Sequence, residues 1–192
     1  MTTFQITGEP AADAVLDDYP LALVIGMQLD QQYGIEHAFR GGYKILSRFG
    51  SLDTAAIAAA DPDEFKALCS IPPAIHRFPG AKAAQVQGLA RIVEDTYGGD
   101  VTRLWSEAAT GAELFRRIKA LPGYGDQTAK ILIALLGKQM GVRPEGWEQA
   151  AGAYAETGSH RSVADVVDGD SLLKVREFKQ AKKASAKAAQ GA

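Results

Sequence analysis

Two closely spaced glycines near the middle of the chain could bind an anion through backbone groups alone. Gly123 and Gly125 follow Pro122, which cannot comfortably extend a helix because its ring clashes with the preceding turn and it lacks an amide donor. Glycine adopts positive φ angles readily and lets another group approach the backbone closely. We therefore expect a turn that points a helix N-terminus outward, with no side chain covering either glycine. Such a terminus favours a phosphate.

Two helices must position this turn. Before it, Leu114, Phe115, Ile118 and Leu121 recur at the three- and four-residue spacing of one helical face. After it, residues 131–136 are apolar almost all round, as in a helix buried in a core. The pattern predicts a helical hairpin over residues 111–139. No strand-like alternation persists in the sequence, and the remaining signals predict helices at 10–18, 20–32, 35–48, 54–60, 61–69, 79–97, 100–108, 111–121, 126–139, 146–154 and 170–187.

The run Leu121-Pro122-Gly123-Tyr124-Gly125-Asp126-Gln127-Thr128-Ala129 resembles the helix-hairpin-helix turn of the base-excision DNA glycosylases, in which L-P-G-x-G-x-x-T-A grips the DNA backbone beside the target base. Residues 23–32 are similar to the early helix of that superfamily, which ends in L-S-Q-Q. Residues 78–100, with Ala81-Lys82-Ala83 and Tyr97-Gly98-Gly99-Asp100, are similar to its K-A-x-x-I helix and Y-G-G loop. The three matches keep the family order over roughly residues 20–140. The resemblance implies an all-α, two-lobed fold with a central cleft, acting on double-stranded DNA in base-excision repair.

The resemblance also implies which residues meet DNA. They are Leu121, Gly123, Tyr124, Gly125, Gln127 and Thr128 in the hairpin, with Gln31 and Gln32 at the end of the early helix. In related enzymes the residue that matches Gln32 enters the duplex near the extruded base. The alternative for Gln31 and Gln32 is a hydrated helix end, and Tyr124 could simply pack the turn. Tyr33 and Trp147 offer flat rings that could stack on a base, although rings of this kind are more often part of the core.

Catalysis in such an enzyme needs a carboxylate, because cleavage of the base–sugar bond develops positive charge on the sugar. The lysine that forms a Schiff base in bifunctional members is matched here by Gln127, whose amide cannot form an imine, so no lyase activity is expected by that route. The V-D-T-H motif that holds the family's catalytic aspartate is absent from the sequence. Glu145, eighteen residues after Gln127, is the candidate acid, with Glu148 and Asp165 as lesser ones. Glu145 could equally be an exposed loop acid.

These observations favour a monofunctional DNA glycosylase that hydrolyses the N-glycosidic bond of a damaged base. The main alternative is a non-catalytic DNA or DNA-damage binding module that has lost the catalytic acid. A third possibility is a helical interaction protein whose hairpin has no nucleic-acid role.

Composition limits the remaining possibilities. The chain of 192 residues is expected to form a helical glycosylase-like domain over residues 1–155 and an extension over residues 156–192 that ends in a basic helical tail. From residue 174 onward there are six bases and one acid, a net charge of +5, which leaves −7 for the rest of the chain. The single cysteine, Cys69, excludes an internal disulfide or a four-cysteine cluster within the chain, and the three histidines lack metal-ligand spacing. We expect no cofactor or metal, no membrane span, a monomer, and a cytoplasmic, nucleoid-associated location in a bacterium.

Overall fold

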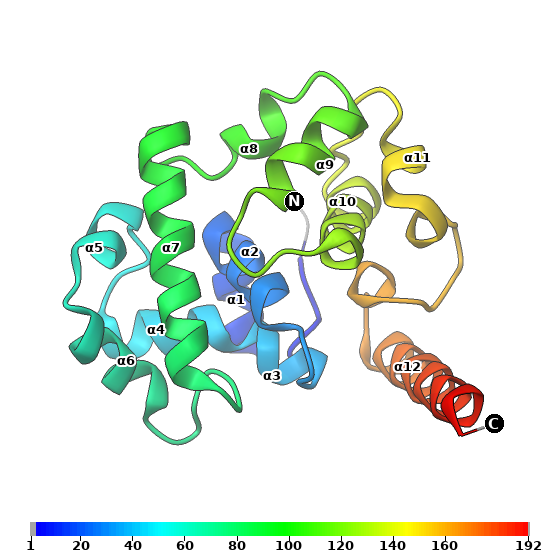
Figure 1. Cartoon of the computed structure of the whole chain (residues 1–192), viewed down its shortest axis with the longest axis horizontal. Helices are drawn as coiled ribbons and strands as arrows, with labels where there is room; N and C mark the ends of the chain where they lie inside the picture. Colours follow the sequence, from blue (N-terminus) through cyan, green and yellow to red (C-terminus); the bar gives the residue numbers. More distant parts are fainter. Residues whose placement is uncertain (1–2, 192) are drawn as a thin grey trace.

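Residues 3–191, which the computed structural model describes, contain helices and no β-strand, so the all-α prediction is confirmed. In chain order these are α1 (Pro10–Asp18), α2 (Pro20–Leu29), α3 (Ile35–Phe39), α4 (Gly41–Phe49), α5 (Thr54–Ala59), α6 (Pro62–Ser70), α7 (Pro79–Tyr97), α8 (Arg103–Ser106), α9 (Gly111–Lys119), α10 (Asp126–Gln139), α11 (Trp147–Ala151) and α12 (Gly169–Gln190), with short 3-10 helices η1 (Gly152–Ala155) and η2 (Val163–Asp165) (Figure 1). None of the helices described is both long and apolar enough to cross a bilayer.

The first seven helices gather around α2 and α7. Every residue of α2 after Pro20 is buried, and the helix packs against α1, α3 and α4. The contact with α4 is close enough to require glycine, since a Cβ atom on Gly42 would lie 2.6 Å from the Cβ atom of Ala22. Helix α7 packs against α5 and α6 on the left of Figure 1.

The later helices gather around α10, which packs against α9, α11 and both 3-10 helices. Its buried residues run almost all round the helix, as the sequence predicted. Helix α10 also contacts α2, and the buried residues of both groups form one continuous hydrophobic core. The hairpin turn between α9 and α10 is therefore fixed against the first group of helices.

Helix boundaries follow local signals that can be read from the sequence. Proline stands at the start of α1, α2, α6 and α7, where its missing amide donor costs nothing. Asp61 caps α6 by accepting hydrogen bonds from the amides of Asp63 and Glu64, and Thr110 caps α9 through the amide of Glu113. The left-handed Gly98 ends α7.

Several predicted helices were too long. The predicted helix 20–32 ends at Leu29, where the amides of Asp30 and Gln31 bond back in a tight turn. The predicted helix 35–48 is two helices that meet at Arg40, because Gly41 and Gly42 weaken the helix there and pack against α2. Segments 100–108, 111–121 and 146–154 also shorten, whereas the C-terminal helix extends three residues past the predicted end at 187.

Candidate nucleic-acid interface

The N-terminus of α10 is open, as the sequence predicted for Gly125. Gly125 is the N-cap residue, its backbone is extended, and a Cβ atom built on it would meet nothing within 4 Å. No side chain among the described residues caps this helix. The first amides of any α-helix have no partner inside the helix, so the exposed positions Gly125, Asp126 and Gln127 present donors at the positive end of the helix dipole.

The expectation that Gly123 would also be uncovered was wrong. A Cβ atom on Gly123 would lie 2.6 Å from Oε1 of Gln85, so α7 covers this glycine. The carbonyl oxygens of the turn face inward and find donors there: Pro122 O accepts from Nε2 of Gln28 at 2.7 Å, and Gly123 O from Nε2 of Gln31 at 2.5 Å. Buried carbonyls need such partners, and one side of the turn is therefore anchored while the other stays open.

Leu121 and Tyr124 hold the turn in place. Both side chains are buried, and the Tyr124 hydroxyl donates a hydrogen bond of 2.6 Å to the carbonyl of Val24 in α2. Burial raises the pKa of Tyr124. Among the other hairpin residues of the predicted set, Gly125 and Gln127 are exposed, and Gly123 and Thr128 are half-buried.

The end of α2 lies beside the turn, and the two glutamines that follow it, Gln31 and Gln32, differ in their contacts. The Gln31 side chain links the turn to α7. Its Nε2 donates to Gly123 O, and its Oε1 accepts a hydrogen bond of 3.1 Å from Nζ of Lys82. The ammonium group of Lys82 is buried, also donates to Gln28 O and Gln85 Oε1, and has a pKa lowered by burial. Gln32 is exposed and has a φ of 54°, a conformation that few non-glycine residues adopt.

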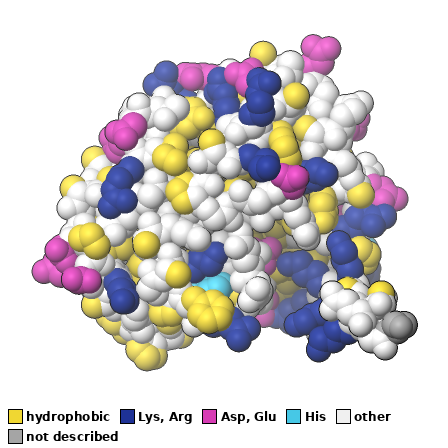
Figure 2. Space-filling view, in the orientation of Figure 1, with side chains coloured by type: hydrophobic (Ala, Val, Ile, Leu, Met, Phe, Trp, Pro, Cys, Tyr) yellow, Lys and Arg dark blue, Asp and Glu magenta, His cyan; other side chains and the backbone are white. Residues whose placement is uncertain are grey.

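Asp30 is an acid of this region that the sequence analysis did not single out. Its side chain is 3% exposed and lies 3.3 Å from Nζ of Lys179 in α12. Burial raises the pKa of Asp30, and Lys179 opposes this rise. Arg176 of α12 pairs in the same way with Glu36. The two ion pairs attach α12 to the end of α2 and to α3. Figure 2 shows a hollow between the main body and α12 with Lys and Arg side chains gathered along it.

Glu145 lies at the start of α9, whereas the hairpin turn lies at its end. Its carbonyl accepts a hydrogen bond of 2.7 Å from the amide of Gly111, and the residue is exposed. Nine residues of helix separate the two places, a length of about 13 Å. Glu145 nevertheless lines a pocket of about 590 Å³ together with Phe115, Arg116 and Lys130. An acid, two cations and an aromatic ring thus share one groove between α9, α10 and α11.

The other predicted candidates are placed less favourably. Gln127 is exposed at the first turn of α10 and forms a hydrogen bond with Tyr154. Glu148 is exposed on α11, and Asp165 is held by Lys138 at 2.6 Å and by the amide of Arg161. The ring of Trp147 lies directly on Gly137 of α10, where there is no room for a Cβ atom. Trp147 therefore packs α11 onto α10.

Tyr33 and His76 form an aromatic group beside the end of α2. Their ring centroids are 4.8 Å apart. His76 is buried, its Nδ1 accepts from the amide of Phe78, and its Nε2 therefore carries the proton and donates to Gln31 O at 2.8 Å. Burial lowers the pKa of His76 and favours this neutral form. Phe78 is 53% exposed and carries Arg77 over its ring, so an apolar ring and a cation face solvent near Gln31.

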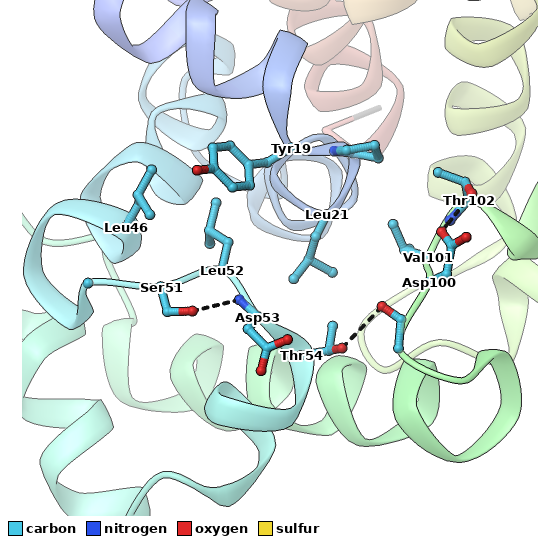
Figure 3. A pocket seen from close by; sticks show the side chains of 13 residues that line it. Tyr19, Leu21, Leu46, Ser51, Leu52, Asp53, Thr54, Asp100, Val101 and Thr102 are labelled. Carbon is cyan, nitrogen blue, oxygen red and sulfur yellow. Dashed lines mark hydrogen bonds between the residues drawn. The ribbon is translucent and has the colours of Figure 1, made fainter.

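A pocket between α2, α4, α5 and the loop after α7 offers little chemistry (Figure 3). It has a volume of about 410 Å³, and its two carboxylates, Asp53 and Asp100, already accept hydrogen bonds from the amides of Ala56 and Thr102. Among residues 3–191 no group of three or more His, Cys, Asp or Glu side chains could hold a metal ion.

No protein-family model matches this chain, and comparisons with curated proteins and with solved structures return no match.

Proposed function

We propose that this chain is a DNA glycosylase with the two-lobed helix-hairpin-helix architecture. It grips duplex DNA through the α9–α10 turn and hydrolyses the N-glycosidic bond of a damaged base without a lyase step. The observation that carries the proposal is the open N-terminus of α10 at Gly125, which no side chain among the described residues caps. Natural helices prefer Ser, Thr, Asp or Asn at this position, and a glycine leaves the amides free for an external anion.

Charges around the turn support a phosphate as that anion. Arg116 and Lys119 lie in the last turn of α9, and Lys130 lies on α10 one turn beyond Asp126. The one acid in the first turn of α10, Asp126, is paired with Lys119, and this pairing lowers the pKa of Asp126. A phosphate at Gly125 would therefore meet the helix dipole and a surplus of cations.

The link between the turn and the end of α2 supports base extrusion. Gln31 bonds the carbonyl of Gly123, and the exposed Gln32 follows it directly. A side chain that fills the gap left by an extruded base must stand at a fixed place relative to the phosphate grip. The Gln31 bridge supplies that fixed relation.

The groove that contains Glu145 supports the hydrolytic step. Glu145 would stabilise positive charge on the sugar and accept a proton from the attacking water, while Phe115 would offer an apolar wall for the base. Gln127 supplies no amine, so the sugar would be attacked by water and left abasic.

One observation favours the second candidate, a binding module without catalysis. Glu145 is exposed and stands a helix length of about 13 Å from the turn. The first test therefore separates binding from chemistry.

Binding is tested by replacing Gly125 with Asp and, as a matched control, with Asn. The backbone of Gly125 is open to any side chain, and both residues are good N-caps, so both variants should fold at least as stably as the parent. The Asp carboxylate would occupy the anion site and repel a phosphate. We expect G125D to weaken duplex binding by roughly tenfold or more relative to G125N. If the two variants bind duplex DNA with equal affinity, the proposal that the hairpin amides bind a DNA phosphate is wrong.

Chemistry is tested on a panel of duplexes that each carry one lesion: uracil, an alkylated purine, an oxidised base or a mismatch. Release of a base with an intact abasic strand supports the glycosylase, and Glu145→Gln should then slow release by roughly 100-fold while leaving binding unchanged. Duplex binding without release from any lesion would support the binding module instead.

A further inference from the structure

Three cations stand in a row along α4, at a site separate from the hairpin. Arg40 precedes the helix, and Lys44 and Arg48 follow one and two turns later. All three line a pocket of about 580 Å³. Like charges four residues apart on a helix repel each other, so this row has an electrostatic cost that requires a compensating group.

The contacts of these cations do not cancel their charge. Arg40 donates to Thr7 O at 2.7 Å, Lys44 to Ala74 O at 2.9 Å and Arg48 to Pro73 O at 2.7 Å, and each acceptor is a neutral carbonyl. Among the described residues that line the pocket, Glu9 is the one acid, 3.4 Å from Nε of Arg40. Three cations and one carboxylate leave a net charge of +2 on the pocket wall.

Burial and the charges of this row act together on Lys44 and on His37. Lys44 is only 9% exposed, and burial together with Arg48 and Arg40 lowers its pKa. The pKa of His37, at the pocket rim, is lowered by burial and then by Arg40 and Lys44. Glu36 lies 3.8 Å from His37 but is paired with Arg176, so it does not neutralise the pocket. An anion bound beside Lys44 would relieve this cost.

The pocket wall also carries two tyrosines, Tyr33 and Tyr43. The Tyr33 ring is held by tilted contacts with His37 and His76, at centroid distances of 5.7 and 4.8 Å. Flat rings beside cations suit an aromatic group that bears an anion. We propose that this pocket binds a phosphomonoester carried on a nucleobase-bearing group, the chemistry of a nucleoside monophosphate or of a 5′-phosphorylated strand end.

Charge selects the phosphomonoester over a phosphate inside a strand. A phosphomonoester carries close to two negative charges at neutral pH, which matches the net charge of the wall, whereas a phosphodiester carries one. The pocket is lined by residues of α3 and α4 together with Glu9, Tyr33 and Pro73, and it includes no residue of the α9–α10 turn. The inference goes beyond the proposed glycosylase activity and does not depend on it.

The test places a competing carboxylate in the pocket. Ser47 is exposed and lines the pocket, and its hydroxyl donates a hydrogen bond to the carbonyl of Tyr43 one turn back in the same helix. Ser47→Glu and its neutral match Ser47→Gln should therefore both fold. Calorimetric titration with deoxyadenosine 5′-monophosphate should show saturable binding that S47E weakens by roughly tenfold and that S47Q changes by less than about twofold.

Deoxyadenosine without the phosphate should not bind. Absence of saturable binding to the monophosphate and to 5′-phosphorylated duplexes, or equal affinities of S47E and S47Q, would overturn the proposal. If inorganic phosphate binds as tightly as the nucleotide, the proposed contact between the nucleobase and the tyrosine rings is wrong. The two sources are distinguished by comparing the free nucleotide with duplexes that end in 5′-phosphate or 5′-hydroxyl. Because G125D leaves this pocket intact, it should keep nucleotide binding, so failure of the hairpin grip and failure of this pocket are seen separately.

Discussion

Asp30 buries a carboxylate at the end of α2, and one lysine of α12 offsets part of the cost. Removing a charge from water is unfavourable unless a partner of opposite charge compensates. Here burial raises the pKa of Asp30 even though Lys179 lies 3.3 Å away, so the compensation is incomplete. The ionised side chain therefore lowers stability at neutral pH, and the ion pair limits that loss.

We expect Lys179→Met to lower the free energy of unfolding at pH 7 by about 1 kcal/mol, a modest value because the Lys179 side chain is 38% exposed and water screens the pair. A raised carboxylate pKa means that the folded state holds the proton more tightly than the unfolded state. Stability then rises as pH falls through the folded pKa, and the deficit of K179M should shrink in acid. Denaturant titrations at pH 7 and pH 4 measure this.

The same substitution at Lys183, an exposed residue of α12, is the matched control and should change stability by less than about 0.5 kcal/mol. If K179M and K183M are equally stable at both pH values, Lys179 does not compensate Asp30.

For the candidate site, sequence reasoning predicted features that depend on local geometry and missed contacts between residues far apart in the chain. Gly125 was predicted because glycine after Pro122-Gly123 and before an apolar helix is a local signal. Asp30 and Lys179 are 149 positions apart, and no periodicity relates them. The row Arg40, Lys44 and Arg48 has a four-residue spacing that the sequence does contain, but its effect depends on the neutral carbonyls that the fold supplies.

At the scale of the element, the two glycines of the hairpin turn differ in backbone conformation and in surroundings. Gly123 has a φ of 78° and faces Gln85, whereas Gly125 has a φ of −96° and faces solvent. Only the first conformation is costly for a residue with a Cβ atom, by about 1–2 kcal/mol.

Gly123→Ala should therefore lower the free energy of unfolding by about 1–2 kcal/mol. The clash with Oε1 of Gln85 adds less to this, because it involves the end of a flexible side chain. Gly125→Ala should change stability by less than about 0.5 kcal/mol, since its backbone angles suit alanine. Thermal and denaturant unfolding of both variants checks this difference, and equal losses would mean that the turn does not hold the two conformations described.

Three helices were predicted to the residue, whereas α6 is displaced by one residue from the predicted 61–69 despite its Asp61 cap. Helices α1, α7 and α10 have the predicted bounds, with Pro10 and Pro79 at two of their starts and Gly98 at one end. The end of α2 and the break at Arg40 depend on tertiary packing. Gly41 and Gly42 lie against Leu29 and Ala22 of α2, and no local pattern shows which partner will meet them.

At the scale of the whole molecule, the charge is divided between an acidic body and a basic C-terminal helix. The first part of α12 is attached: Val175 is buried, and Arg176 and Lys179 pair with Glu36 and Asp30. From residue 180 to residue 191 every position is exposed. The attached part offsets the charges of two acids of the body, and the exposed part presents Lys182, Lys183 and Lys187 to solvent.

The exposed lysines should contribute long-range attraction to DNA without contributing to stability. Each cation that displaces a counterion from duplex DNA adds about 0.9 to the slope of log K against log salt concentration. Replacing Lys182, Lys183 and Lys187 together by Gln should therefore reduce the slope by up to about 2.7 units. Because these side chains are exposed, the free energy of unfolding should change by less than about 0.5 kcal/mol. The G125N background, in which the hairpin amides are capped by a neutral side chain, shows whether helix and hairpin act independently: independent contacts give the same reduction in slope in both backgrounds. A slope that the triple substitution leaves unchanged would assign the whole electrostatic attraction to the body of the protein, which carries Arg116 and Lys119 in the last turn of α9 and Lys130 on α10.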